Sequence, residues 1–230
     1  LLDLDGTIWE GGRAIPGAVE GVIASGLPAM YVTNNASRAP EAVAEQLRSI
    51  GLPAKDSDVL TSAQAAIEMV SDRIPAGSKV FVLGSPSFRA LAEQAGFVVV
   101  DSADDAPIAV LQGHSPETGG AQLSEAALAI QRGAVYVASN LDTTLPQERG
   151  LMIGNGSMVA AVVSATGVVP DSAGKPGPPM FFSAAAKLGS SRPLAVGDRL
   201  NTDIAGGNAA GMDTFQVLTG VSGRPAAPDQ

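Results

Sequence analysis

Short apolar runs alternate with amphipathic stretches along most of the chain. An apolar run closed by Gly, Pro or a polar cluster predicts a strand, whereas apolar residues that recur every three or four positions predict a helix. Strands are predicted at residues 1–5, 29–32, 80–83, 97–100, 108–111, 135–138, 194–196 and 214–218. Helices are predicted at 40–50, from 61 or 62 past 70, at 85–95, at 123–130, from 157, at 180–188 and from near 202.

Some helix ends can be predicted from single residues. Pro40 suits the first turn of a helix, because an N–H group there would have no partner inside the helix. Val43, Leu47 and Ile50 then fall on one face, and Gly51 ends the helix. The repeated alternation of strand and helix predicts an α/β fold built on a doubly wound parallel sheet.

The middle of the chain carries a complete set of strands and helices of its own. We therefore predict an inserted α/β domain at residues 65–172, within a Rossmann-like core domain built from residues 1–64 and 173–230. Residues 16–30 are short for a full crossover helix. The tail, residues 223–230, is rich in Pro and Ala and is predicted to be irregular.

Composition narrows the range of functions without identifying one. Of the 230 residues 45% are hydrophobic, which is ample for packed cores, and the formal net charge is −9. An acidic chain has little attraction for nucleic acid or an anionic membrane, and no apolar run approaches the ~20 residues that span a bilayer. The absence of cysteine excludes disulfides, thiolate catalysis and cysteine-based zinc sites. We expect a soluble cytoplasmic protein without a nucleic-acid or membrane partner.

Acidic residues mark the ends of several predicted strands. Asp3 and Asp5 close the first apolar run and, being two residues apart, share one side of a strand, although strand twist and the turn at Gly6 can re-aim Asp5. Two carboxylates so close repel each other unless a cation or a shared proton intervenes. Thr33 and Asp198 also follow predicted strands, and Asp203 lies in the first turn of the next helix. Because the carboxyl ends of parallel strands meet at one edge, these groups predict a site for a hard cation such as Mg²⁺.

Four segments carry these residues in a fixed order, namely Asp3-Leu4-Asp5-Gly6-Thr7, Thr33-Asn34-Asn35, Gly174-Lys175-Pro176 and Gly197-Asp198-Arg199-Leu200-Asn201-Thr202-Asp203. The series resembles the four ordered motifs of the haloacid dehalogenase-like phosphatase superfamily. The inserted domain resembles the large α/β cap of its p-nitrophenylphosphatase-like branch, through the segments Ala138-Ser139-Asn140-Leu141-Asp142, Glu148-Arg149-Gly150-Leu151 and Gly154-Asn155-Gly156-Ser157. The resemblance covers nearly the whole chain. By comparison with the family, the chain stops before the last strand and helix of the core, and it begins without Met. Two explanations follow from the resemblance: either terminal residues are absent from this sequence, or the core is trimmed.

The resemblance implies roles for five residues in phosphoryl transfer. Asp3 would attack phosphorus and form an aspartyl phosphate, a two-step route that a carboxylate nucleophile allows. Asp5 would protonate the leaving group and later take a proton from the attacking water. Lys175 would neutralise charge on Asp3 and on the phosphoryl oxygens, which Thr33 and Asn34 would also bind.

The resemblance also implies the cofactor and the class of substrate. Mg²⁺ would be held by Asp3, Asp198 and Asp203, together with Asp5 through its backbone carbonyl rather than its side chain. The expected substrate is a small phosphorylated metabolite, such as glycerol 3-phosphate, 2-phosphoglycolate, a sugar phosphate or a nucleoside monophosphate, with p-nitrophenyl phosphate as an artificial one. The chain looks closest to bacterial members that act on glycerol 3-phosphate, and a homodimer through the cap is expected.

Two other functions use the same residues. A phosphotransferase or mutase would pass the aspartyl phosphate to an organic acceptor, so free phosphate would not accumulate. A non-catalytic phosphate-binding or regulatory module would be expected to lack at least one motif residue, and none is lacking. A two-component receiver domain also carries a phosphorylated Asp, but its acid pair is arranged differently and it has no cap.

Several residues also have an ordinary structural interpretation. Taken alone, Thr33 is an N-cap or turn residue, Lys175 a surface lysine and Asp203 a favourable residue at a helix N-terminus. The segment Gly154-Asn155-Gly156 lacks the Lys-Ser/Thr ending of a phosphate-binding P-loop and is interpreted as a tight turn before a helix. His114 is the only histidine, which cannot build a zinc site by itself, and it is assigned to a loop.

Overall fold

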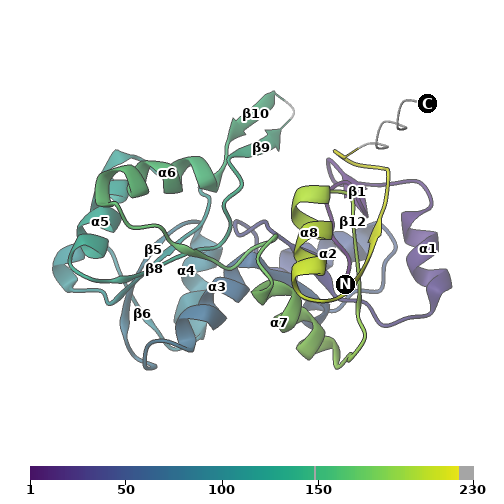
Figure 1. Cartoon of the computed structure of the whole chain (residues 1–230), viewed down its shortest axis with the longest axis horizontal. Coiled ribbons are helices and arrows are strands. Elements are labelled where there is room, and N and C mark those ends of the chain that lie inside the picture. The colour runs from purple at the N-terminus through teal and green to yellow at the C-terminus, as the bar shows by residue number, and fades with distance from the viewer. Residues whose placement is uncertain (148, 223–230) are drawn as a thin grey trace. The chain divides into compact units, whose positions relative to one another are not determined.

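The computed structural model describes residues 1–147 and 149–222 (Figure 1). Glu148 of the predicted cap motif and the tail 223–230 lie outside the described residues. Nothing in the described part of the chain is a helix with the length and apolar character needed to cross a lipid bilayer.

The contacts within the chain divide it into two units. The first unit consists of residues 1–33, 40–60 and the chain from 175 onward, and the second consists of residues 34–39 and 61–174. The chain therefore leaves the first unit twice. These boundaries lie within a few residues of 64/65 and 172/173, and they add the short segment 34–39 to the second unit.

Five parallel strands form the sheet of the second unit, in the order β11-β8-β7-β5-β6. The strands are β5 (Lys79–Leu83), β6 (Val98–Val100), β7 (Ala109–Gln112), β8 (Val135–Ala138) and β11 (Asp171–Ser172). The strand order reverses between β5 and β7, which is the arrangement of doubly wound α/β sheets. The predicted α/β class with a parallel sheet is confirmed.

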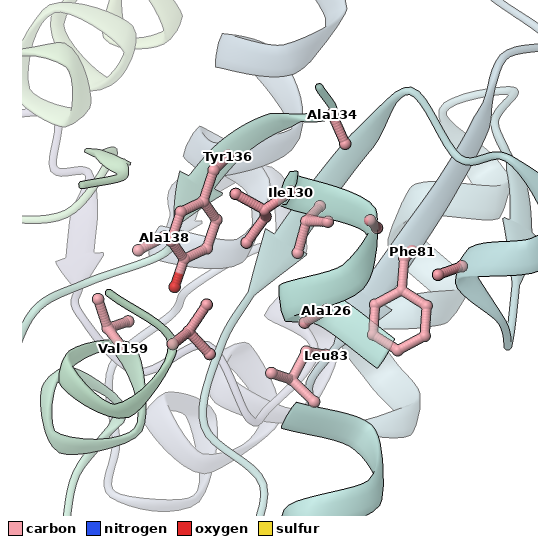
Figure 2. Packing of buried hydrophobic residues seen from close by; sticks show 12 residues of the cluster. Phe81, Leu83, Ala126, Ile130, Ala134, Tyr136, Ala138 and Val159 are labelled. Carbon is pink, nitrogen blue, oxygen red and sulfur yellow. The ribbon is translucent and has the colours of Figure 1, made fainter. Parts of the chain in front are cut away.

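Helices cover both faces of this sheet. The helices are α3 (Ser62–Ser71), α4 (Pro86–Gln94), α5 (Gly120–Gln131) and α6 (Asn155–Thr166). Phe81 and Tyr136 belong to the apolar cluster that includes Ile130 of α5 and Val159 of α6 (Figure 2). Side chains alternate along each strand, so the neighbours of Phe81 and Tyr136 in β5 and β8 face the other side of the sheet. Helices α3 and α4 also contact the sheet. This burial on both faces explains why the strands read as continuous apolar runs.

The sheet of the first unit is assembled around the N-terminal segment. Strand β3 (Tyr31–Thr33) pairs with β4 (Val59–Thr61), and β12 (Leu194–Gly197) pairs in parallel with β13 (Asp213–Gln216). Leu2 forms parallel bridges to both inner strands, at Tyr31 and at Val196. The N-terminal segment therefore lies between β3 and β12, and its carboxyl end lies at the same edge of the sheet as theirs.

The strand predicted at residues 1–5 is shorter than expected. The bridges from this segment to β3 and β12 are those at Leu2, because the chain turns after Leu4 and Asp5 instead forms a bridge with Trp9. The amides of Thr7, Ile8 and Trp9 all donate to the Leu4 carbonyl, at 3.2, 2.8 and 3.1 Å. The turn ends the strand between Asp3 and Asp5. Asp5 therefore does not continue the strand that holds Asp3, and alternation along a strand does not fix the two side chains on one face.

The helices of the first unit complete its core. They are α1 (Ala18–Ser25), α2 (Pro40–Ser49), α7 (Pro179–Leu188) and α8 (Ala205–Ala209), with a π-helical turn at Leu200–Ile204 before α8. Val43 and Leu47 of α2 are buried with Leu4, Ile8 and Trp9, which confirms the apolar face predicted for this helix.

The elements that the pattern missed are short. They are helix α1, strands β4 and β11, the 3₁₀ turns Asp56–Asp58 and Ala103–Asp105, and two hairpins, β1 (Trp9–Glu10) with β2 (Arg13–Ala14) and β9 (Thr144–Gln147) with β10 (Gly150–Ile153). Helix α1 has eight residues, none of them buried, and lies in the stretch 16–30 that we expected to be short for a full crossover helix. Two- to four-residue strands do not produce a recognisable alternation of apolar and polar residues. Helix α6 begins at Asn155 rather than at Ser157.

Candidate active site

The edge where the parallel strands of the first unit end brings two of the predicted acids together. Asp3 follows Leu2 in the N-terminal segment, and its amide donates to the Val196 carbonyl of β12 at 2.9 Å. Asp198 follows directly after β12. Gly6, in the turn after Asp3, has a φ of 90°, in the left-handed region that favours glycine. The turn leaves both aspartates at the carboxyl ends of neighbouring strands, where α/β sheets bind ligands.

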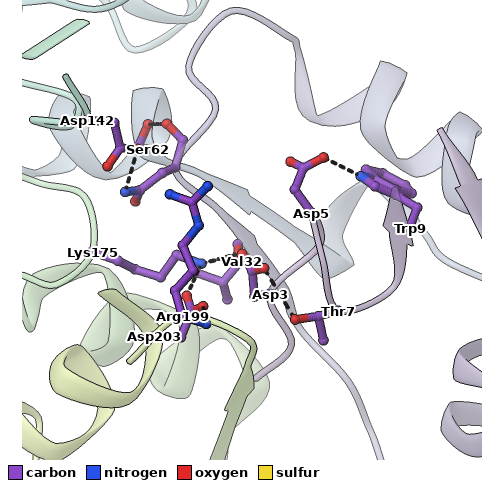
Figure 3. A network of polar contacts seen from close by, with 11 residues as sticks. Asp3, Asp5, Thr7, Trp9, Val32, Ser62, Asp142, Lys175, Arg199 and Asp203 are labelled. Carbon is purple, nitrogen blue, oxygen red and sulfur yellow. Dashed lines mark hydrogen bonds and ion pairs between the residues drawn. The ribbon is translucent and has the colours of Figure 1, made fainter. Parts of the chain in front are cut away.

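Lys175 lies between two carboxylates at this edge (Figure 3). Its Nζ is 2.5 Å from Asp3 Oδ1 and 2.6 Å from Asp203 Oδ1, and it donates to the Val32 carbonyl at 3.2 Å. The Lys175 side chain is only 4% exposed, with 11% for Asp3 and 4% for Asp203. Lys175 is therefore a buried cation paired with two acids, and the alternative interpretation as a surface lysine is wrong.

Burial and charge shift the pKa values of this group in opposite directions. Burial raises the pKa of Asp3 to about 7, although the Lys175 ammonium lowers it and the Asp203 charge raises it further. Burial alone would lower the pKa of Lys175, but the carboxylates of Asp3 and Asp203 outweigh that effect and raise it. The Lys175 side chain therefore keeps its positive charge beside the carboxyl groups of Asp3 and Asp203.

Asp198 adds a third buried carboxylate. One ligand oxygen from each of Asp3, Asp198 and Asp203 lies within 4.8 Å of the other two. Asp198 Oδ2 accepts a hydrogen bond from the Val221 amide at 2.7 Å, while the buried Oδ1 has no hydrogen-bond partner among the described residues. Burial raises the pKa of Asp198, and the bond from Val221 opposes that rise.

These carboxylates form a donor set that fits a hard divalent cation. Mg²⁺ prefers oxygen ligands and takes one or two carboxylates together with water and substrate oxygens. The buried Asp198 Oδ1 lacks the partner that such an atom needs, and a cation would supply it. Three acids and one lysine also leave an excess of negative charge, which a divalent cation would balance.

Asp5 lies apart from the three clustered carboxylates. Its side chain is exposed, and Oδ1 accepts a hydrogen bond from the indole Nε1 of Trp9 at 2.9 Å (Figure 3). In the part of the chain that the structure describes, the group of carboxylates suited to a metal contains Asp3, Asp198 and Asp203. The Asp5 carboxylate is therefore positioned by an aromatic donor instead of by a shared cation.

The two residues predicted to bind phosphate beside Lys175 belong to different units. Thr33 is buried at the end of β3 in the first unit. Asn34 belongs to the second unit, where its Nδ2 donates to Asp142 Oδ2 at 3.1 Å and its carbonyl accepts from Ser62 Oγ and Asn140 Nδ2, at 2.6 and 2.7 Å.

The cap motifs of the sequence are brought together within the second unit. Asn155 donates to the Asn140 carbonyl at 2.7 Å from the start of α6. A Cβ atom on Gly154 would lie 2.3 Å from the Asp142 carbonyl oxygen, and one on Gly156 would lie 2.1 Å from the Leu141 carbonyl oxygen. These glycines allow close backbone packing where α6 begins, with Gly154 as its N-cap and Gly156 already in its first turn, so the helix starts earlier than the predicted tight turn allowed. His114 is half-buried in the loop after β7.

Several residues near the site were missed by sequence reasoning. Thr7 Oγ1 lies 3.4 Å from Asp3 Oδ2, and Trp9 donates to Asp5. Trp9 is the only tryptophan and comes four residues after Asp5, which is a signal that a search for local hydrogen-bond donors could have used. The Val221 amide leaves no signal in the sequence, because any residue except proline supplies the same backbone donor.

Two family models match the two ends of the chain. Residues 1–98 match the family described as haloacid dehalogenase-like hydrolase, and residues 172–230 match one described as HAD-hydrolase-like. Together they include all four motif segments at the strand ends.

Individual proteins match over almost the whole chain. A D-glycerol 3-phosphate phosphatase of Mycobacterium tuberculosis is 46% identical over 222 residues, 96% of this chain and 63% of that protein. An acid sugar phosphatase of Staphylococcus aureus is 38% identical over 227 residues, 96% of this chain and 86% of that protein. The chain thus spans less than two thirds of the length of the mycobacterial relative.

Solved structures give the same result. A crystal structure of a glycerol phosphate phosphatase from Mycobacterium tuberculosis in complex with magnesium has a TM-score of 0.93 and 46% identity, over 96% of this chain and 67% of that one. A p-nitrophenyl phosphatase from Archaeoglobus fulgidus has a TM-score of 0.91 and 32% identity, over 97% of this chain and 87% of that one.

Proposed function

Since this chain belongs to the haloacid dehalogenase-like hydrolase family, in its p-nitrophenylphosphatase branch, we propose that it is a Mg²⁺-dependent phosphatase that hydrolyses a small phosphomonoester. The observation that carries the proposal is the arrangement of Asp3, Lys175, Asp198 and Asp203. In this arrangement the buried Asp3 carboxylate lies 2.5 Å from the buried Lys175 ammonium group, and Asp198 and Asp203 lie beside Asp3. The relatives named above are phosphatases, and one was crystallised with magnesium.

Asp3 acts as the nucleophile in this proposal. One of its carboxylate oxygens attacks phosphorus, the ester P–O bond breaks, and an aspartyl phosphate forms on Asp3. A water molecule then attacks the same phosphorus, the bond to Asp3 breaks, and inorganic phosphate is released. Fixed neighbours hold Asp3 for this attack, since its amide is bonded to β12 and its side chain to Lys175.

Asp5 handles the protons of both steps. It gives a proton to the departing alkoxide and takes one from the attacking water, so it ends the cycle as it began. Its carboxylate is exposed, and the hydrogen bond from Trp9 Nε1 limits its orientation.

Lys175 and Thr33 stabilise negative charge during the transfer. The Lys175 ammonium faces the Asp3 oxygen and is close enough to contact a phosphoryl group bound there. Thr33 is the last residue of β3, at the same edge of the sheet, and binds a phosphoryl oxygen through its hydroxyl or amide. We retain Asn34 as a phosphate-binding residue in the proposal, with its side chain released from Asp142 for that purpose.

Mg²⁺ would be held by Asp3, Asp198 and Asp203, with the backbone carbonyl of Asp5 as a further ligand. When bound, the cation supplies positive charge that offsets the charge of the phosphoryl oxygens and of the three acids. Asp198 Oδ1 supports this assignment, because it is a buried acceptor without a hydrogen-bond donor among the residues that the structure describes.

The two units have separate roles in the proposal. The first unit is the catalytic core, since it contains Asp3, Lys175, Asp198 and Asp203, and the second is the cap domain predicted at residues 65–172. Glycerol 3-phosphate is the first candidate substrate, because the mycobacterial relative at 46% identity is a D-glycerol 3-phosphate phosphatase. Sugar phosphates and 2-phosphoglycolate follow. We further propose a cytoplasmic location and a homodimer.

The proposal is tested by measuring phosphate release from glycerol 3-phosphate, sugar phosphates, 2-phosphoglycolate and p-nitrophenyl phosphate, with Mg²⁺ and with EDTA. We expect Mg²⁺-dependent release by the wild type and a loss of at least about a thousandfold in Asp3→Asn, which keeps the shape of the nucleophile but removes its charge. Asp72→Asn is the matched control, because Asp72 is exposed at the end of α3. Activity that survives in Asp3→Asn, or is absent with every substrate, contradicts the proposal.

A further inference from the structure

The segment Thr219–Ser222, which we call the Asp198 clamp, follows the last strand of the first unit. The Val217 amide still pairs with the Gly197 carbonyl at 2.9 Å, which extends the contact between β13 and β12. After this bond the chain leaves the sheet and passes over Asp198. The clamp therefore starts beside the end of β12, the strand that leads into Asp198.

The clamp contacts the Asp198 carboxylate directly. The Val221 amide donates to Oδ2 at 2.7 Å. A Cβ atom on Gly220 would lie 2.0 Å from the same oxygen and 2.3 Å from Asp198 Cγ, well inside van der Waals contact. Only a residue without a side chain lets the backbone approach the carboxylate so closely. Gly6 faces it as well, since a Cβ atom there would lie 2.8 Å from Asp198 Cγ and Oδ2.

Side-chain hydrogen bonds fix the clamp at both of its ends. Thr219 Oγ1 donates to the Gly6 carbonyl at 2.7 Å, in the turn that follows Asp3 and Asp5. Ser222 Oγ accepts from the Leu200 amide at 3.2 Å, and its carbonyl accepts from Gln216 Nε2 at 3.0 Å. The clamp thus joins the loop after the nucleophile to the loop after Asp198.

We infer that Thr219–Ser222 determines the cation affinity of the site by holding Asp198 in one orientation. The Val221 amide occupies Oδ2, and Gly6 and Gly220 enclose the carboxylate, which leaves Oδ1 without a hydrogen-bond partner within residues 1–147 and 149–222. A ligand fixed in this way loses no rotational freedom when the cation arrives, so affinity rises. The inference rests on the proposed function, because it takes Asp198 as a ligand of Mg²⁺. Gly220 and Thr219 are positioning residues in it, since they act through Asp198.

Calorimetric titration of the metal-free protein with MgCl₂, without substrate, tests the clamp. Gly220→Ala introduces the Cβ that collides with Asp198 Oδ2, and we expect Mg²⁺ binding roughly 10- to 100-fold weaker than in the wild type. Thr219→Val removes the hydroxyl that holds Gly6, and we expect binding about three- to tenfold weaker. Thr219→Ser keeps the hydroxyl and is expected to bind Mg²⁺ like the wild type.

Gly21→Ala is the matched control for Gly220→Ala. Gly21 lies in α1 of the same unit, and a Cβ atom there would have no neighbour within 4 Å. The thermal unfolding midpoint in EDTA is recorded for every variant, because a purely structural role would lower it without changing the affinity for Mg²⁺. Should Gly220→Ala fail to fold, the pair Thr219→Val and Thr219→Ser still decides the question.

The outcomes separate the inference from the function on which it rests. A wild type that binds no Mg²⁺ overturns both. A wild type that binds Mg²⁺, with Gly220→Ala and Thr219→Val binding it equally well, overturns the clamp and leaves the phosphatase proposal standing. Weaker binding in both variants, with normal binding in Thr219→Ser and Gly21→Ala, supports the clamp.

Discussion

Replacing Lys175 by methionine should separate the structural from the catalytic contribution of the charge cluster. Methionine keeps much of the length of the lysine side chain but removes its charge and its hydrogen bonds. In the wild type Nζ lies 2.5 Å from Asp3 Oδ1 and 2.6 Å from Asp203 Oδ1, and all three side chains are largely buried. The substitution leaves the carboxylates of Asp3 and Asp203 without the ammonium group that lies between them. The charge of Arg199 still acts on Asp198.

The expected loss of stability is large in the absence of metal. Removing one partner of a buried ion pair destabilises a protein by about 3–5 kcal/mol, because the other charge stays buried without compensation. For a chain of this size 1 kcal/mol corresponds to about 2–4 °C, so the unfolding midpoint in EDTA should fall by roughly 6–20 °C. Protonation of Asp3, whose pKa burial already raises to about 7, would relieve part of this penalty and move the result toward the lower end.

Magnesium should restore stability to Lys175→Met without restoring activity. A cation bound to the folded state stabilises it by about 2.7 kcal/mol at a concentration of 100 times Kd. The variant has one positive charge fewer at the site, so its midpoint should rise more with Mg²⁺ than that of the wild type. Its kcat should stay roughly 100- to 1000-fold low, since a donor to the reacting oxygens is missing.

The assay is thermal unfolding in EDTA and in saturating MgCl₂, combined with phosphate release under the second condition. Lys55→Met is the matched control, because Lys55 is exposed in the same unit. The reasoning is refuted if Lys175→Met unfolds in EDTA at the same temperature as the wild type and the control. It is also refuted if the variant retains full activity in Mg²⁺.

Three further predictions concern Asp198, Asp5 and Asn34. Asp198→Asn should abolish measurable Mg²⁺ binding in calorimetry while leaving the unfolding midpoint in EDTA equal or higher, because burial makes this charge unfavourable without a cation; undiminished Mg²⁺ binding would show that it is not a ligand. Asp5→Asn should lower kcat roughly 10²- to 10⁴-fold as the loss of a general acid and base. Trp9→Phe removes the donor to the Asp5 carboxylate and leaves a smaller ring in the core, and it should lower kcat less than about tenfold; equal effects on kcat would argue against proton transfer by Asp5. In a double-mutant cycle, Asn34→Ala and Asp142→Ala should show a coupling of about 0.5–1.5 kcal/mol in unfolding free energy, and additive effects would contradict the hydrogen bond at 3.1 Å.

The acids at strand ends could be predicted because the apolar pattern of a strand stops there and the pattern of a helix begins. A strand pattern that closes on a polar residue places that residue at an edge of the sheet, and this applies to Asp3 and Asp198 alike. The position of Lys175 could not be predicted from the strand pattern. Lys175 lies 172 residues from Asp3 in the sequence and follows a loop, so only the resemblance to a family placed it beside the nucleophile.

Other features depend on contacts that the sequence does not encode locally. The turn after Leu4 shortens the first strand and separates Asp5 from Asp3, and its cause is a set of backbone bonds to one carbonyl. The hydrogen bond from Val221 to Asp198 comes from a backbone amide, which carries no side-chain signature. Short hairpins such as β9 with β10 span too few residues to produce a period.

The central claim, a covalent aspartyl phosphate on Asp3, is tested most directly by trapping it. The enzyme is mixed with excess substrate and Mg²⁺, quenched in acid during turnover, reduced with borohydride and digested for mass spectrometry. Borohydride converts an aspartyl phosphate to homoserine and leaves free carboxylates intact. The account predicts homoserine in place of Asp3, with Asp5 unchanged, and no such product in Asp3→Asn or without substrate. Homoserine at another aspartate, or active turnover with none at Asp3, would contradict it.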